Sequence, residues 1–80
     1  LAQEAKIRVI KGETSPIEYY MNKYFMDLPA LAAGMGLPKW RVKRHFTPKV
    51  FDKISGKLLK RYAEFFNIDV VDIKNIKETI

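Results

Sequence analysis

The feature that most constrains this chain is a glycine-containing break between a short apolar segment and a short basic one. Residues 28–46 read LPALAAGMGLPKWRVKRHF, with the break at Gly34 and Gly36. Glycine readily adopts the left-handed backbone conformation that a tight turn between helices requires. We therefore predict two short helices, Leu28–Gly34 and Pro38–Phe46, joined by a tight turn.

The second of these segments carries basic side chains around one aliphatic residue, Val42. A helix this short is not stable alone in water, because helix nucleation is costly. Val42 must therefore anchor the helix to a body formed by the rest of the chain, and the basic side chains then face outward. An anchored, basic, exposed helix after a tight turn has the properties of a helix-turn-helix DNA reader. The basic residues are Lys39, Arg41, Lys43 and Arg44.

Positive charge is concentrated in this part of the chain. The 80 residues carry a net charge of +6, with a pI near 9.7. Nine of the residues from 39 to 61 are Lys or Arg, and Asp52 is the single acid among them. Basic domains bind polyanions such as nucleic acid or an anionic membrane surface. The uneven distribution favours a binding face over charge that serves only solubility.

Composition argues against several other classes of protein. Cysteine is absent, which rules out disulfides and a thiolate zinc site. His45 is the only histidine, so we expect no metal site and no cofactor. We see no catalytic triad or phosphate loop, and therefore expect neither an enzyme nor a small-molecule substrate. No segment reads as a transmembrane span or a signal peptide, so we expect a cytoplasmic protein without a membrane partner, nucleoid-associated if bacterial.

Helix signals divide residues 16–80, which we predict to form one domain of five helices. Thr14-Ser15-Pro16 offers a hydroxyl cap and a first-position proline for a helix whose apolar residues run to Phe25. Asp27 is expected to cap the helix that begins at Leu28. We expect a loop over residues 47–51 and then a long helix, Lys53–Phe66, which Asp52 caps and Asn67 closes. Asp69 is expected to cap a last helix that runs to about Glu78.

Residues 1–15 lack a helical core pattern and are predicted to be an N-terminal arm, a linker or a short strand. Lys6–Lys11 alternates and is rich in β-branched residues, which is typical of a strand. A lone strand needs a partner, such as a second copy or a neighbouring domain. The predicted fold class is therefore all-α, with a short strand or arm before the helices.

A glycine, Gly36, follows Leu31-Ala32 by four residues, and an aliphatic residue, Val42, follows the glycine by six. With these residues at this spacing, the chain resembles the lambda-repressor-like (Cro/CI, Xre) helix-turn-helix family. In that family a small residue permits close helix crossing, a glycine makes the turn, and an aliphatic residue anchors the reading helix. The chain departs from the family at Leu28, where Gln is common, and at Phe46-Thr47-Pro48, where Glu-x-Gly is common. The resemblance covers roughly Pro16 to Ile76 and includes Leu58-Leu59-Lys60-Arg61-Tyr62-Ala63 and Phe66-Asn67-Ile68-Asp69.

The resemblance implies a transcriptional regulator that binds double-stranded DNA through residues 38–46. Such domains usually bind two half-sites as dimers, and Lys6–Ile10 or the last helix could supply the contact for a homodimer. It implies base or phosphate contacts for Lys39, Trp40, Lys43 and Arg44, and phosphate contact for Arg41. Because helix N-termini offer N–H groups to anions, we also expect phosphate contacts, or else a plain basic loop, at Thr47, Lys49 and Lys53.

Trp40 leaves three alternatives open. It could contact a thymine methyl or a sugar, anchor a protein interface, where Trp is enriched, or belong to the core if the helix is rotated. The competing function is a protein-interaction module on a helix-turn-helix scaffold that does not read DNA, with Phe46 and Phe51 beside Trp40. RNA binding is a third alternative. We expect His45 to be a partly buried helix residue, near phosphate.

Overall fold

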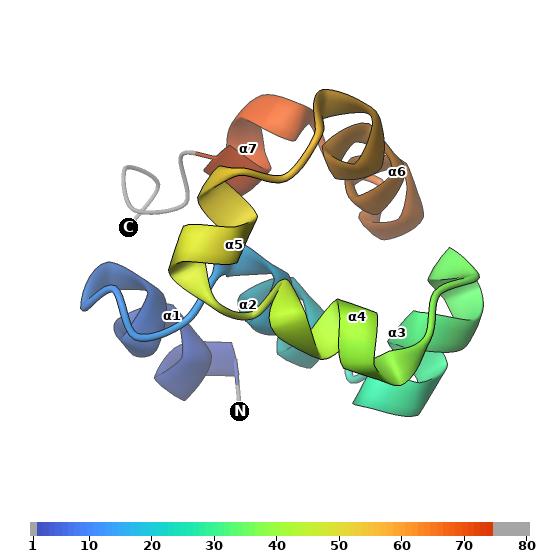
Figure 1. The fold of residues 1–80 in the computed structure, drawn as a ribbon. Helices are drawn as coiled ribbons and strands as arrows, with labels where there is room; N and C mark the ends of the chain where they lie inside the picture. Colours follow the sequence, from blue (N-terminus) through green and yellow to red (C-terminus); the bar gives the residue numbers. More distant parts are fainter. Residues whose placement is uncertain (1, 75–80) are drawn as a thin grey trace.

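The computed structural model describes residues 2–74, and all of their regular structure is helical (Figure 1). The predicted all-α class is confirmed for this part of the chain, although it contains more helices than expected. Over the same residues, no helix combines the length and the apolar character needed to cross a membrane. The helices are α1 (Ala2–Ile10), α2 (Pro16–Lys23), α3 (Leu28–Met35), α4 (Lys39–Arg44), α5 (Pro48–Asp52), α6 (Gly56–Phe66) and α7 (Val70–Lys74).

The N-terminal segment is a helix that packs on α2, so the predicted strand or loose arm is wrong. Ala5 and Val9 are buried, and Arg8 forms an ion pair with Glu18 of α2. The buried pair lies four residues apart, which places both side chains on one face of a helix. Within Lys6–Lys11 alone, the alternation is too short to separate a helix from a strand.

Two predicted helix starts are confirmed by their capping bonds. The Ser15 side chain accepts the backbone N–H of Ile17 at 3.3 Å, and Pro16 fills the first position of α2. The Asp27 carboxylate accepts the N–H of Ala30 at 2.9 Å at the start of α3. Each cap satisfies a backbone donor that the first helical turn leaves unpaired.

The predicted helix end at Asn67 and the predicted left-handed turn residue at Gly36 are also confirmed. The predicted break at Gly34 is wrong, because α3 continues through Gly34 to Met35. Gly36 closes α3 with φ 68°, and Asn67 closes α6 with φ 58°, both in the left-handed region. Phe25 also has φ 57°, lies beyond the end of α2 and is 94% exposed, so the prediction that the apolar residues of this helix run to Phe25 is wrong. The chain turns there between α2 and α3, which carries the side chain away from the core.

The predicted loop and single long helix over residues 47–66 are instead two helices. Pro48 fills the first turn of α5, where a missing N–H costs nothing. Asp52 ends α5, so its expected role as the cap of Lys53–Phe66 is wrong. Ser55 caps α6 and accepts a backbone N–H at 3.1 Å. Gly56 therefore stands at the first position of α6 and not inside a helix.

The core gathers side chains from all seven helices around Tyr62, which is fully buried. Its ring lies 6.3 Å from that of Phe66, and the Phe66 ring lies 5.7 Å from that of Tyr20. This aromatic stack connects α6 to α2. The predicted last helix begins as expected after Asp69, and its expected continuation to Glu78 lies outside the described residues.

Helices α3 and α6 are in close contact at Gly34. A Cβ atom added at Gly34 would overlap the ring of Phe65 in α6. The close crossing expected at Ala32, which is buried, therefore also depends on the glycine two residues later. Figure 1 shows the result: α4 lies across one side of the molecule between α3 and α5.

Candidate nucleic-acid interface

Val42 fixes α4 to the body, as the sequence predicts. Its side chain is fully buried, whereas the other five residues of α4 are exposed. Only Gly36, Leu37 and Pro38 separate α3 from α4. A short connection of this kind and one buried aliphatic residue set the position of the basic helix.

The segment before α2 holds the other end of α4. The Ser15 hydroxyl donates to the carbonyl of His45, and the Ser15 N–H donates to the carbonyl of Phe46 at 2.8 Å. The Thr14 hydroxyl donates to the same Phe46 carbonyl at 3.2 Å. We call residues 14–15 the strap. It satisfies carbonyls that a helix end leaves without intrahelical partners.

His45, which directly follows α4, is more buried than expected and connects the end of α4 to the core. It is 6% exposed, and its Nδ1 lies 2.6 Å from the hydroxyl of Tyr62. Burial lowers the pKa of His45, and the nearby charges of Arg41 and Arg44 lower this pKa further. Burial also raises the pKa of Tyr62. The pair is therefore neutral at physiological pH and joins α4 to α6.

All eight residues predicted to contact DNA are exposed. Trp40 is 62% exposed, which excludes its alternative place in the core. Lys53, expected at the start of a long helix, instead follows the last residue of α5. The eight residues are Lys39, Trp40, Arg41, Lys43, Arg44, Thr47, Lys49 and Lys53.

Helical geometry divides the exposed side chains of α4 into an outer face and two flanks. Successive residues of an α-helix are about 100° apart, and Val42 defines the inward direction. Trp40 and Arg44, each about 160° from Val42, then point most directly away from the core. Arg41 lies about 100° from Val42 on the flank toward α6. Lys43 lies at the same angle on the opposite flank, and Lys39 lies on that flank closer to the body.

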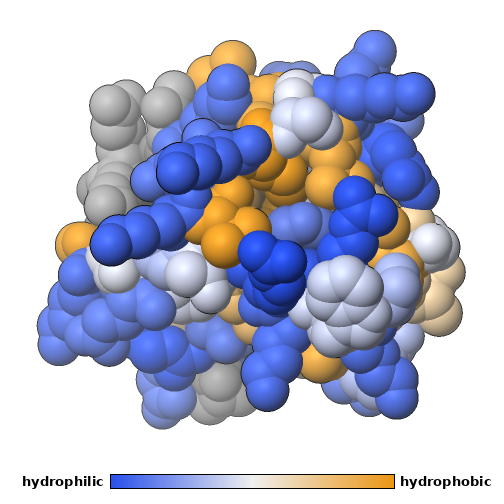
Figure 2. Space-filling model, in the orientation of Figure 1, coloured by the Kyte–Doolittle hydropathy of each residue, from blue (hydrophilic) through white to orange (hydrophobic). Residues whose placement is uncertain are grey.

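A groove of about 430 Å³ runs between α4 and the segment formed by α5 and the start of α6. Figure 2 shows apolar surface between strongly hydrophilic side chains on the face that carries α4. The groove brings together half of the predicted contact residues; Lys39, Lys43, Thr47 and Lys49 lie outside it. Its lining consists of Trp40, Arg41, Arg44, His45, Val50, Lys53, Ile54, Ser55 and Leu58.

Sequence reasoning missed the contribution of α6 to this surface. Lys57 and Arg61 line a second hollow of about 190 Å³, which Arg41 shares with the groove. The signal was present, since both residues belong to the basic window that ends at Arg61. The expected helix boundaries, however, placed neither residue beside α4. Arg61 also donates a hydrogen bond to the carbonyl of Met35 at the end of α3.

The basic side chains around α4 are not neutralised within the described chain. Across residues 2–74, the one ion pair is that of Arg8 with Glu18, which lies between α1 and α2. No Asp or Glu lines the groove or the second hollow. Their positive field is therefore available to an external anion.

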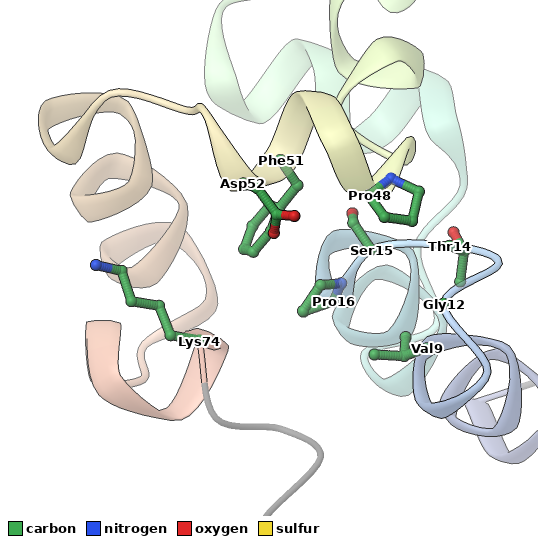
Figure 3. Close-up of a pocket in the computed structure, with 9 residues that line it drawn as sticks. All are labelled: Val9, Gly12, Thr14, Ser15, Pro16, Pro48, Phe51, Asp52 and Lys74. Atoms are coloured by element: carbon green, nitrogen blue, oxygen red, sulfur yellow. The ribbon is translucent and has the colours of Figure 1, made fainter.

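A third hollow, of about 200 Å³, lies apart from this surface (Figure 3). It opens between α1, α2, α5 and α7, and its charged residues are Asp52 and Lys74. None of the eight predicted contact residues lines it. Across residues 2–74, no group of three His, Asp or Glu side chains could hold a metal ion.

Comparison of the chain with protein-family models, with curated proteins and with solved structures finds no match.

Proposed function

We propose that this chain is a lambda-repressor-like helix-turn-helix domain that binds double-stranded DNA through α4 and regulates transcription. The observation that carries the proposal is the arrangement of α4. Val42 is fully buried, whereas Lys39, Lys43 and Arg44 are exposed. The short turn after α3 gives the order of helices that major-groove readers use.

The side chains divide naturally between the two tasks of a DNA reader. Lys43 and Arg44 are exposed on α4, and Arg and Lys side chains can pair with guanine O6 and N7. Arg41, Lys53 and Lys57 flank α4 and suit phosphate contacts, which set orientation without reading sequence. The absence of carboxylates from the lining of the groove keeps phosphate from being repelled.

The test is binding to duplex DNA as the salt concentration rises. For a phosphate-dominated interface, log K falls linearly with log salt, with a slope of about −0.9 per neutralised phosphate. We expect Lys43→Ala and Arg44→Ala each to weaken binding by roughly 5- to 150-fold, corresponding to about 1–3 kcal/mol.

Lys11→Ala is the matched control. It removes the same charge from an exposed residue that lines neither hollow beside α4, so its effect should be much smaller. The proposal fails if no duplex binds even at low salt, or if all three substitutions weaken binding equally. Selection of bound sequences from random duplexes would then identify the preferred site.

A further inference from the structure

The groove beside α4 has a lining that DNA contact alone does not explain. Val50, Ile54 and Leu58 are partly buried and form an apolar floor. A duplex presents mainly phosphates, sugars and the polar edges of bases to a protein. Apolar side chains recessed between α4 and α6 offer these groups neither a charge nor a hydrogen-bond donor.

The rim of the same groove is cationic. Arg41, Arg44 and Lys53 surround the floor, and no acidic residue lines it. A partner that fits must therefore carry negative charge around an apolar group. Arginine suits this role because its planar guanidinium pairs with a carboxylate through two parallel hydrogen bonds.

Trp40 adds a third property that points to a protein partner. It lines the groove, yet 62% of its surface is exposed. Trp and Arg are the residues most enriched among those that dominate the energy of protein interfaces. The volume of about 430 Å³ lies near the lower end of the ~300–1,000 Å³ typical of ligand pockets, which suits a few side chains of a peptide.

We propose that this groove binds an acidic peptide segment of another protein, with a large apolar side chain on the floor and carboxylates on the rim. The apolar side chain contacts Val50, Ile54 and Leu58, and the flanking carboxylates pair with Arg41, Arg44 and Lys53. This binding does not require that α4 read DNA. If α4 also binds DNA, the two partners compete, because both use Arg41 and Arg44.

The first test is a selection of random peptides displayed on phage against the whole chain. It is run at about 0.15 M salt, where exposed charges are largely screened beyond ~8 Å. We expect enriched peptides to carry acidic residues on both sides of a large apolar residue. Enrichment of acidic residues without an apolar one, or no enrichment, overturns the proposal.

The second test places an enriched, tryptophan-free peptide in the groove. Trp40 is the only tryptophan of the chain, so its emission reports on the groove directly. We expect the peptide to shift this emission, and we expect Ile54→Ala and Arg44→Glu each to weaken binding by roughly tenfold or more. Lys11→Glu, the matched charge reversal outside the groove, should leave peptide affinity unchanged.

Ile54→Ala also separates this proposal from DNA binding, because it alters the floor and keeps every charge. Duplex affinity should stay at its original value in this variant while peptide affinity falls. Val50→Ser, at a second floor position, should repeat that result, and thermal unfolding checks that both variants are folded. Unchanged peptide affinity in both variants, or a peptide that leaves Trp40 emission unaltered, overturns the proposal.

Discussion

Ser15 acts at two sites with one hydroxyl. It accepts the N–H of Ile17 as the cap of α2, and it donates to the carbonyl of His45 at the end of α4. Its side chain is 1% exposed, so a substitution leaves buried partners without water. A residue that looks like an ordinary helix cap in the sequence therefore also sets the position of the basic helix.

Replacing Ser15 by Ala should cost more than replacing an ordinary cap. Loss of a cap costs about 1 kcal/mol, and loss of a hydrogen bond that leaves a buried carbonyl unpaired adds about 1–3 kcal/mol. Ser55→Ala is the matched control, because Ser55 caps α6 from an exposed position. Urea unfolding of the two variants measures the difference; equal losses would show that the hydrogen bond from the Ser15 hydroxyl to the His45 carbonyl contributes nothing to stability.

His45 should make the stability of the domain depend on pH. Its pKa is lowered from 6.5 by burial first and by Arg41 and Arg44 second, so the unfolded chain binds the proton more readily. Stability is therefore complete above about pH 6.5 and falls as the pH drops from there toward the lower pKa of the folded state. Protonation also has to be accommodated beside the hydroxyl of Tyr62.

The measurement is the free energy of unfolding between about pH 5 and pH 8. His45→Gln serves as the control, since it keeps a polar side chain and cannot titrate. We expect the free energy of unfolding of this variant to change much less with pH between pH 5.5 and 7, approximately the range in which an ordinary histidine titrates. A wild-type curve that is flat over this range, or as steep as that of His45→Gln, would contradict the assignment.

At the scale of elements, the contact between α3 and α6 decides how α4 is presented. α4 follows directly from α3, and α3 is set against α6 where Gly34 meets the ring of Phe65. A side chain at residue 34 must push this ring aside. The orientation of the basic helix is thus coupled to the absence of one Cβ atom on its neighbour.

Gly34→Ala should lower the free energy of unfolding by about 1 kcal/mol. Overpacking costs about 1–3 kcal/mol, and the better helix propensity of Ala returns up to about 1 kcal/mol. In a Phe65→Ala background the same change should become stabilising, because the obstructing ring is gone. Gly56→Ala, where nothing lies within 4 Å of the added atom, is the control for propensity. Chemical denaturation of the four variants tests this; a loss that persists without the Phe65 ring would contradict it.

The elements that the sequence predicted correctly are those with unambiguous end signals. Ser15 and Asp27 start helices, and Gly36 and Asn67 end them, because each residue type has a specific local geometry. Val42 was predictable as the anchor because it is the only aliphatic residue of its segment. These residues were enough to predict α3, the turn after it and the anchored helix α4 without any knowledge of tertiary contacts.

The errors arose where one local signal fits two structures. Pro48 can follow the end of one helix or begin another, and it begins α5. Asp52 is a good cap by type, yet Ser55 makes the capping bond. The pattern of apolar residues in Lys6–Lys11 fits both a strand and a helix, and only the packing of this segment against α2 makes it a helix. The groove could not be predicted, because its floor and rim come from elements whose relative positions depend on these boundaries.

At the scale of the whole molecule, the helices fold into a body with extents of 30 × 25 × 23 Å. Positive charge is clustered around α4 and the start of α6, whereas the described ion pair lies between α1 and α2. A small body with one cationic side is oriented by the field of an approaching polyanion before contact. Its encounter with any acidic partner should therefore be faster at low salt.

The strap has a consequence for the order in which the molecule folds. Its side-chain bonds join residues 30 and 32 positions apart, whereas α1 packs on α2, α3 on α4, and α6 on α7 as neighbours along the chain. Contacts between distant residues form more slowly, because the intervening loop must first be ordered. We therefore expect α4 to reach its final orientation after these neighbouring pairs have packed, so that a newly synthesised chain acquires its basic surface only once the strap has closed.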